Sequence, residues 1–515
     1  MRVQKQLRAC GSYAGTRMAA MVVTATVLAL SGCISMAPPY EAPALPVAQQ
    51  YDADDGRDGL SASATGWQAY FTDTRLQALI EQALENNRDL RTAVLRVEEA
   101  RAAFGIQRAE LFPHLNAQAG VSRLSIPADV SPFGMPMRVT QYQVGAGVSS
   151  WEIDFWGRVR NLNEAALESY VASDAARRAV ALGLIAQVAD SYLVLRELDE
   201  RIALAQQTVD SRTETLRIFS RRVAVGATSR LNQTQVETLL TQAQALLTQL
   251  QQALLTQLQQ ARDAQAHGLA LLVGKPIDLP PVSEPLDEHR MLAELRAGLP
   301  SDLLTQRPDI AAAEHRLRAA HASIGAARAA FFPRVALTGA YGTLGPELGN
   351  LFAPGTRAWV FAPSISLPLF EGGKLRSNLD LAEARRDLAV AGYEKIVQSA
   401  FRDVSDALSA RKWLADQLDI AKAALAALTE RARLSQLRFD AGASTFLEVL
   451  DAQRDLLAAQ QQLVQVRRAL LSSRVGLYAA LGGGTQAVES ESDLQPHLSL
   501  TPPPRASGVS GGTTP

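Results

Sequence analysis

Cysteine is almost absent from this chain of 515 residues, which contains only Cys10 and Cys33. A disulfide framework of the kind that holds small secreted domains together is therefore excluded. An excess of charge of one sign is lacking as well, since 51 Lys and Arg residues balance 52 Asp and Glu residues. A nucleic-acid-binding protein would show a basic stripe, so we expect no nucleic-acid partner.

Groups for catalysis are sparse. The six histidines are dispersed, and His315 and His321, six residues apart, fall on different faces of a helix instead of forming a metal-binding pair. The phrase Gly372-Gly373-Lys374 lacks the earlier glycine that a phosphate-binding loop requires. No nucleophile, base or metal set converges, so the sequence predicts a protein that is not an enzyme and uses no cofactor and no metal.

Long apolar runs are missing after the N-terminus, so we expect no transmembrane helix. Residues 18–30 form one short apolar run that follows basic residues and ends at Leu30-Ser31-Gly32-Cys33. This pattern is typical of a bacterial secretory signal over residues 1–32. Its last four residues match the lipobox of bacterial lipoproteins, which implies a diacylated Cys33; a small residue that merely precedes a cleavage site is the alternative. Ile34 is not the aspartate of an inner-membrane retention signal, which favours the outer membrane.

The chain contains an internal repeat. The segment RAAFGIQRAELFPHLNAQAGV, which starts at Arg101, recurs at His321 as HASIGAARAAFFPRVALTGAY, with an offset of 220 residues. Further on, RRVAVGATSRLNQTQ recurs as LRFDAGASTFLEVLD, which aligns Gly226 with Gly442 at an offset of 216. Two tandem copies of a unit build one wall or ring with pseudo-symmetry, not two independent domains.

Each copy is predicted to be mostly helical. Residues 158–225 and 374–441 are free of proline, and at about 1.5 Å per residue each would form a helix of roughly 100 Å. Gly226 and Gly442 end these helices and mark hairpin tips. Shorter helices are expected over 74–111, 229–272, 302–331 and 445–481. The expected organisation is a signal peptide (1–32), a tether (33–66), a first repeat (67–273), an equatorial linker (274–301), a second repeat (302–482) and a flexible tail (483–515).

Two segments show a period of two instead. Apolar and polar residues alternate over 142–151 and again over 359–369, and each segment follows a partner strand, over 115–126 and 335–342. Two β-hairpins (115–153 and 335–369) with this pattern are typical of transmembrane β-strands, although a soluble hairpin explains each alternation alone. Four strands cannot close a barrel, so several chains must share one: three would give twelve strands, and two would give eight, too narrow for a pore.

Three motifs carry a resemblance to a known family: Gln306 to Glu314 (QRPDIAAAE), Ala329 to Pro333 (AAFFP) and Gly442 to Arg454 (GASTFLEVLDAQR). From about Trp67 to Gly484 the chain resembles the outer-membrane efflux factors, specifically the lipoprotein members of the NodT and OprM type, relatives of TolC. The resemblance implies a homotrimer in which a 12-strand outer-membrane barrel continues into a long periplasmic α-helical barrel.

The same resemblance implies the exit duct of a tripartite pump that exports drugs or other small toxic compounds and confers antibiotic resistance. Its implied partners are a periplasmic adaptor (membrane fusion protein) and a proton-driven inner-membrane transporter of the RND type. A type I secretion duct and a non-pore coiled-coil lipoprotein are the alternatives. The lipobox argues against the first, and the period-two strands argue against the second.

The resemblance also implies a periplasmic gate at the second hairpin tip, formed by Leu447, Glu448, Asp451 and Arg454. Relatives carry a leucine constriction, carboxylates and a gating arginine at these positions. The first-repeat counterparts Leu231, Asn232, Gln235 and Thr238 are uncharged, which suggests that the second hairpin faces the pore. For Glu448 a capping box with Thr445 is the competing interpretation. Arg438, Phe439 and Ser444 are weaker candidates, and the turns at Gly226 and Gly442 are expected to contact the adaptor.

The first repeat is eight residues too long on the descending side of its hairpin. Gly226 and Gly274 are 48 residues apart, whereas Gly442 and Gly482 are 40 apart. The sequence ALLTQLQQ at 245–252 is followed at once by an identical copy. We interpret the excess as a tandem duplication without a functional role and expect it to be absorbed at the end nearer Gly274.

Overall fold

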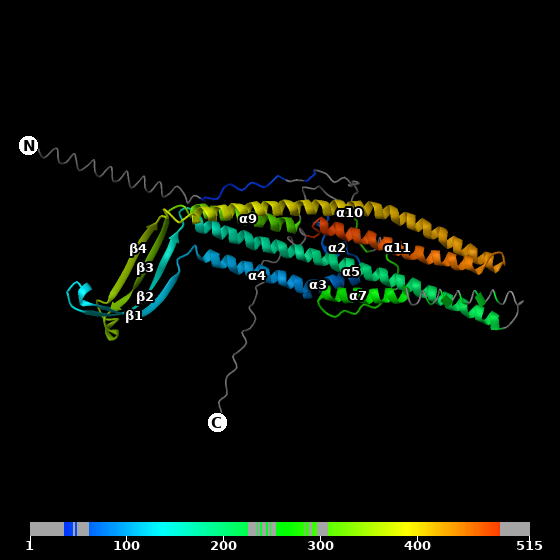
Figure 1. The fold of residues 1–515 in the computed structure, drawn as a ribbon, viewed down its shortest axis with the longest axis horizontal. Helices are drawn as coiled ribbons and strands as arrows, with labels where there is room; N and C mark the ends of the chain where they lie inside the picture. Colours follow the sequence, from blue (N-terminus) through cyan, green and yellow to red (C-terminus); the bar gives the residue numbers. More distant parts are fainter. Residues whose placement is uncertain are drawn as a thin grey trace, which may run out of the picture. The chain divides into compact units, whose positions relative to one another are not determined.

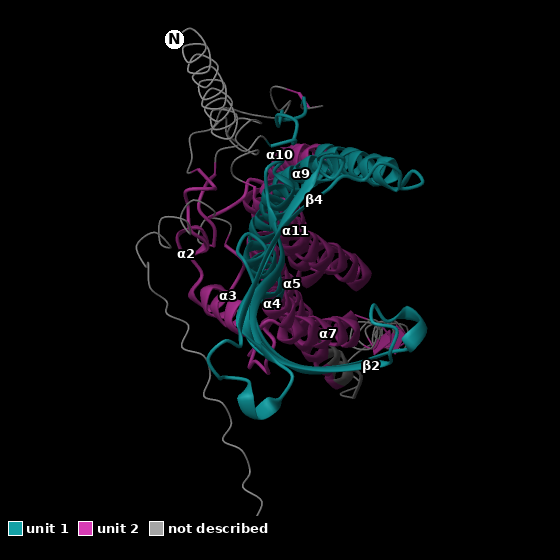
Figure 2. Ribbon diagram, turned by 90° about the vertical axis from the view of Figure 1, so that its left-hand side faces the viewer, with its two compact units in different colours: residues 1–45, 94–175, 312–395 teal, residues 46–93, 176–311, 396–515 magenta. Residues whose placement is uncertain are grey.

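The computed structural model describes residues 35–44, 47–48, 61–224, 254–282, 284–287, 291–295 and 307–484, with single positions between 234 and 248. Cys33, Gly226 and most of the first hairpin tip therefore lie outside the described residues. The chain forms two compact units (Figure 2). Unit 1 comprises residues 1–45, 94–175 and 312–395, and unit 2 comprises residues 46–93, 176–311 and 396–515. Each unit draws on both repeats, so the units do not follow the repeat boundaries.

Unit 1 contains a single four-stranded antiparallel sheet in the order β1-β2-β3-β4, visible in Figure 1. Its strands are β1 (Leu115–Ile126), β2 (Met137–Ile153), β3 (Arg334–Gly345) and β4 (Arg357–Ser366), with 3-10 turns η1 (Ala128–Val130) and η4 (Leu348–Asn350) in the two hairpin loops. The two expected hairpins are therefore present, and β2 joins β3 to make one sheet from both repeats. β2 begins before the predicted alternation and β4 ends before residue 369.

The strand register places both alternation patterns on one face of the sheet, because directly opposite residues in paired strands share a face. One such row across the four strands is apolar throughout: Ala117, Ala146, Tyr341 and Trp359. The neighbouring row, on the other face, consists of one polar and three small residues: Gln118, Gly145, Gly342 and Ala358. Trp359, Phe361 and Ile365 on the apolar face of β4 are largely exposed. The next row on this face contains Thr343 and Arg357, so the face is largely but not wholly apolar, and its apolar side chains on β4 are exposed within the described chain.

Glycines in left-handed conformation end the sheet and start the long helices. Gly157 has φ of 76° and its repeat counterpart Gly373 has φ of 89°, a backbone that L side chains rarely adopt. Each precedes the first residue of a helix of 67 residues, α5 (Arg158–Ala224) or α10 (Lys374–Asp440). The predicted strand-to-helix turn is therefore present in both repeats.

The remaining helices are shorter. They are α2 (Trp67–Tyr70), α3 (Thr74–Asn86), α4 (Arg88–Ala109), α7 (Thr256–Val273), α9 (Pro308–Ala329) and α11 (Phe446–Ala480). The single helix predicted over 74–111 is wrong, because Asn87 interrupts it with an extended backbone, ψ of 134°. The Asn87 side chain explains the break: its Oδ1 accepts from the Leu90 N–H at 2.9 Å and so starts α4 as a cap.

Unit 2 contains two matching hydrophobic clusters, one per repeat. In the second repeat Leu418 of α10 packs with Leu463, Val466 and Leu470 of α11. In the first repeat Leu198 and Ala205 of α5 pack with Leu258 of α7, and Leu254 and Leu255 flank them. The long-helix members of the two clusters correspond at an offset of 216, and the short-helix members correspond at 208.

The difference of eight residues between these offsets locates the excess length. Packing is already in the repeat register at Leu255 and Leu258, so the extra residues precede this cluster in the chain. The expectation that they are absorbed near Gly274 is wrong. Leu254 and Leu255 form a π-helical turn, and such turns absorb an odd residue in an α-helix. Eight residues exceed one heptad by one, which is the excess that a single π-turn removes.

A belt of buried charge on α5 positions the segment that follows α7. Asp199, which is buried, accepts from Arg262 Nε at 2.6 Å and from the Val282 N–H at 3.1 Å. Glu200 accepts from the Leu286 N–H at 3.0 Å. These bonds satisfy buried carboxylates with backbone and guanidinium donors, and they fix the described part of the expected equatorial linker against α5.

One helical stretch, Arg158–Glu214, is long and apolar enough to cross a membrane by composition alone, with 44% of its most apolar window buried in the protein. A partly buried core helix meets the same criteria. We interpret α5 as such a helix, because it also carries the buried charge belt of unit 2.

Candidate gate at the second hairpin tip

The tip of the second hairpin is a compact turn that its glycine makes possible. Gly442 has φ of 72°, directly after the end of α10. The Gly442 N–H donates to the Phe439 carbonyl at 2.9 Å, and the Ala443 N–H donates to the Arg438 carbonyl at 2.8 Å. These two bonds form a Schellman motif, which satisfies the last carbonyls of α10 and requires a left-handed residue at Gly442. The predicted tip turn is present at Gly442, while its counterpart Gly226 lies outside the described residues.

The first turns of α11 have a packed face and an exposed face. Phe446, Val449 and Leu450 are buried, with Leu450 only 1% exposed. The four predicted gate residues project from the opposite side: Leu447, Glu448, Asp451 and Arg454 are all 44% exposed or more. The structure therefore brings the four predicted residues together on one helix face.

The charges on this face form a short chain of ion pairs. Asp451 lies 3.5 Å from Arg454, which in turn lies 3.4 Å from Asp455. Asp455 also accepts from Arg431 of α10 at 2.7 Å, and this bond holds the pKa of the Asp455 carboxyl below its usual value. Asp455 was missed from the sequence, although its repeat counterpart, Leu239, is uncharged. The repeat comparison that singled out Asp451 would have found it.

The capping-box interpretation of Glu448 is wrong. Thr445 is the N-cap of α11, but its side chain makes no capping hydrogen bond. Glu448 instead lies 3.6 Å from Arg438, at the end of α10. The weaker candidate Arg438 therefore holds the acidic residue, and its neighbour Phe439 packs against Phe446 with ring centroids 5.2 Å apart. A carboxylate in the first turn remains favourable to the helix dipole.

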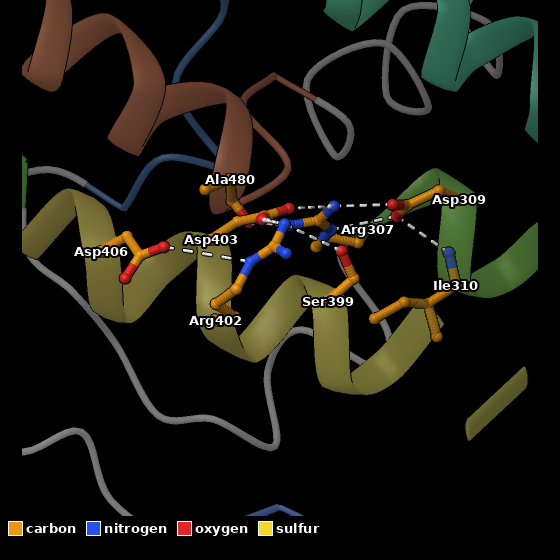
Figure 3. Close-up of polar contacts among 8 residues, drawn as sticks. All are labelled: Arg307, Asp309, Ile310, Ser399, Arg402, Asp403, Asp406 and Ala480. Atoms are coloured by element: carbon orange, nitrogen blue, oxygen red, sulfur yellow. Dashed lines mark hydrogen bonds and ion pairs between the residues drawn. The ribbon is translucent and has the colours of Figure 1, made fainter. Parts of the chain in front are cut away.

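The QRPD motif forms a different polar site, away from the tip (Figure 3). Arg307 precedes α9 and makes a bidentate contact with Asp309, its Nη2 lying 2.6 Å from Oδ2. Its Nη1 donates to the Ala480 carbonyl at the C-terminal end of α11 at 3.0 Å, and Asp403 of α10 lies 3.6 Å away. Burial alone would lower the pKa of the Arg307 guanidinium, but the two carboxylates raise it.

The first repeat builds the same corner with an amide. Asn87 is the counterpart of Arg307 at the offset of 220, and its Nδ2 donates to the Leu272 carbonyl at 2.8 Å, in the last turn of α7. Leu272 and Ala480 correspond at the offset of 208. The signature motif is therefore a structural corner, in which a side-chain donor before one helix binds a carbonyl at the end of another.

Within the described residues no group of three or more His, Cys, Asp or Glu side chains could hold a metal ion. His315 pairs instead with Glu168 of α5, Nδ1 to Oε2 being 2.6 Å.

Comparison with known proteins identifies the class. A family model described as outer membrane efflux protein matches residues 79–265 and 299–483. The antibiotic efflux pump outer membrane protein ArpC of Pseudomonas putida is 41% identical over 466 residues, which cover 89% of this chain and 94% of ArpC. Outer membrane protein OprJ of Pseudomonas aeruginosa is 41% identical over 471 residues, which cover 91% of this chain and 97% of OprJ.

Solved structures agree. The open state of the MtrE outer membrane channel of Neisseria gonorrhoeae gives a TM-score of 0.77 at 39% identity, with 88% of this chain and 98% of MtrE covered. CusC gives a TM-score of 0.75 at 34% identity, with 87% of this chain and all of the CusC chain covered. The chain therefore belongs to the outer membrane efflux protein family. The expected TolC-like fold, outer-membrane location and role as an efflux channel are confirmed.

Proposed function

We propose that this protein is the lipid-anchored, trimeric exit duct of a tripartite pump. The observation that carries this proposal is the sheet of unit 1, which has one largely apolar face and, within the described chain, no partner strand beyond β1 or β4. An open sheet edge in hydrocarbon leaves backbone groups unsatisfied at several kcal/mol each. Three copies joined edge to edge give a closed barrel of twelve strands, large enough for a pore.

The segment after Cys33 supports a lipid anchor beside the sheet. Ser35 Oγ donates to Asn161 Oδ1 at 2.9 Å, in the first turn of α5. Ala37 lies against Gly325 of α9, where a built Cβ would come within 2.8 Å of its backbone N and Cβ. Cys33 is only two residues before Ser35 in the chain. The acyl chains would enter the membrane near the strand-to-helix turn of β2 and α5.

The partners and cargo follow from the class and from the relatives. ArpC is named for antibiotic efflux and SrpC, 43% identical over 466 residues, for solvent efflux. The cargo proposed here is accordingly small, largely apolar toxic compounds. We assign the turns at Gly226 and Gly442 to a periplasmic adaptor, which would couple the duct to an RND-type transporter in the inner membrane.

The test of the function compares a host strain lacking the gene with the same strain complemented. Complementation should lower accumulation of a fluorescent drug and raise resistance, and the purified protein should stay trimeric in SDS and give current steps in a planar bilayer. Loss of a secreted protein without a change in drug accumulation would favour the type I secretion duct. A protein that gives no current steps and does not change drug accumulation would be the non-pore lipoprotein.

The gate is proposed at Leu447, Glu448, Asp451 and Arg454. Three copies would bring carboxylates around one narrow axis, where like charges repel unless they are paired, and Arg454 pairs with Asp451. Replacing Asp451 and Arg454 together by Ala should raise conductance and make cells leaky to large antibiotics. The matched change of Gln235 and Thr238 to Ala should do little. Equal effects from both hairpins would refute this assignment.

A further inference from the structure

Among the described residues, Arg212 of α5 is a buried cation without an acidic partner. The residue is 6% exposed, its Nη2 donates only to the Leu450 carbonyl at 3.4 Å, and its Nη1 has no hydrogen-bond partner in the described structure. Burial lowers the pKa of the Arg212 guanidinium, and no nearby carboxylate counteracts the effect. A guanidinium has five N–H donors, so this side chain is far from satisfied.

Another arginine on the same helix is paired and hydrogen-bonded, and among its donors only Nε lacks a partner in the described structure. Arg196 is 7% exposed, but it donates to Tyr192 Oη at 3.3 Å and to the Glu284 carbonyl at 2.8 Å, and Asp73 lies 3.8 Å away. Burying a charge is costly unless paired and hydrogen-bonded, so Arg196 meets the condition and Arg212 does not.

The repeat shows that packing does not require a charge at this place. The counterpart of Arg212 in α10, at the offset of 216, is Leu428, which is partly buried. A long helix of this fold therefore accommodates an apolar side chain at this position. An unsatisfied arginine that a leucine could replace is a sign of function, because it lowers the stability of the arrangement that contains it.

The place of the contact indicates which element Arg212 acts on. Leu450 lies on the packed face of α11, and the next residue is Asp451 of the proposed gate. We propose that Arg212 is a positioning residue for the gate: it destabilises the packing of α11 on α5 seen here, so that the gate-bearing turns of α11 can move. The proposal rests on the proposed gate, since it assigns the moving element to those residues.

The test replaces Arg212 by Met, which keeps the length of the side chain without the charge, and separately by Leu, the residue of the other repeat. Both variants should raise the melting temperature of the detergent-solubilised protein. They should also slow amide hydrogen exchange over residues 446–455 by about tenfold. Single-channel recordings should show fewer transitions between conductance levels, a readout that stability alone does not move.

Arg196→Met is the matched control, because it removes an arginine of similar burial that has an acidic partner, Asp73. Arg196→Met should lower the melting temperature and speed amide exchange in the segments that Arg196 contacts. The Arg212 variants should raise the melting temperature and slow exchange over residues 446–455. If both Arg212 variants melt lower, exchange faster or fail to assemble, Arg212 is a stabilising tether and the proposal is wrong. Slower exchange with unchanged channel transitions would also overturn it. A wild-type protein without any current would refute the channel assignment, while the exchange data would still decide whether Arg212 destabilises α11.

Discussion

Two arginines pair with the same carboxylate and so provide a matched test of how burial sets the value of an ion pair. Arg402 lies 2.8 Å from Asp403 with a side chain that is 68% exposed, whereas Arg307 lies 3.6 Å from it and is 11% exposed. Distance alone would make Arg402 the stronger partner. Removing one partner of a buried pair strands a desolvated charge at about 3–5 kcal/mol, while an exposed pair contributes about 0–1 kcal/mol.

The carboxylates that Arg307→Met leaves behind, Asp309 and Asp403, are 35% and 36% exposed, so water partly solvates them. We therefore expect Arg307→Met to destabilise the corner by about 1–3 kcal/mol, mainly through lost charge-assisted hydrogen bonds, and Arg402→Met by less than about 1 kcal/mol. Arg307 also loses its bond to the Ala480 carbonyl, so α9 and α11 should both loosen. Hydrogen exchange is the suitable assay, because a chain of this size need not unfold in one step. Amides at the start of α9 should exchange roughly tenfold faster or more in Arg307→Met. Similar rates in the two variants would refute the burial argument.

Three further outcomes follow from the contacts. Cysteines introduced at Ala205 and Leu258 should be cross-linked by a short bis-maleimide both in the full chain and after deletion of residues 245–252, because the packing there is already in the repeat register. Loss of the cross-link on deletion would show that the duplication sets this register. Cys33→Ala, with a cleavable signal, should lower assembly but leave some trimer in membranes, and a wholly soluble protein would contradict the shared barrel. Asp73→Ala should lower the free energy of unfolding by about 1 kcal/mol or more, because Asp73 caps α3 at Arg75 and Leu76, whereas Thr445→Ala should cost a few tenths, since Thr445 makes no capping bond; equal melting-temperature losses would contradict this.

Periodicity predicted the regular elements well where a single rule decided them. The lack of proline, together with a glycine at the end of each stretch, predicted the bounds of both long helices to within a residue or two. Alternation of apolar and polar residues predicted the four strands. Local patterns are strong there because each residue obeys the same geometric constraint. The register that joins β2 to β3 depends on contacts between residues nearly two hundred positions apart, and alternation alone does not encode it.

The failures share a cause, which is a polar side chain whose partner comes from another helix. Asn87 looks like an ordinary helical residue until its contact with the Leu272 carbonyl is seen. Glu448 fits a capping box by spacing, yet Arg438 across the turn competes for it. Arg212 lies within an unbroken helical pattern, and only its burial shows that it is unusual. Spacing rules describe local competition, and they miss a partner supplied by the fold.

Comparison of the repeats separates what the fold needs from what it does not. Gly274 and Gly482 are both glycine and both have a left-handed backbone, with φ of 80° and 74°. Other residues adopt this conformation only at a cost in free energy. Asn87 and Arg307 keep only a donor, so the corner requires a hydrogen bond and not a charge. At the hairpin tips the pattern reverses: Asp451 and Arg454 stand where the first repeat has the neutral residues Gln235 and Thr238. Both charged side chains are exposed and contribute little to packing, and these positions are therefore where channel function should be sought first.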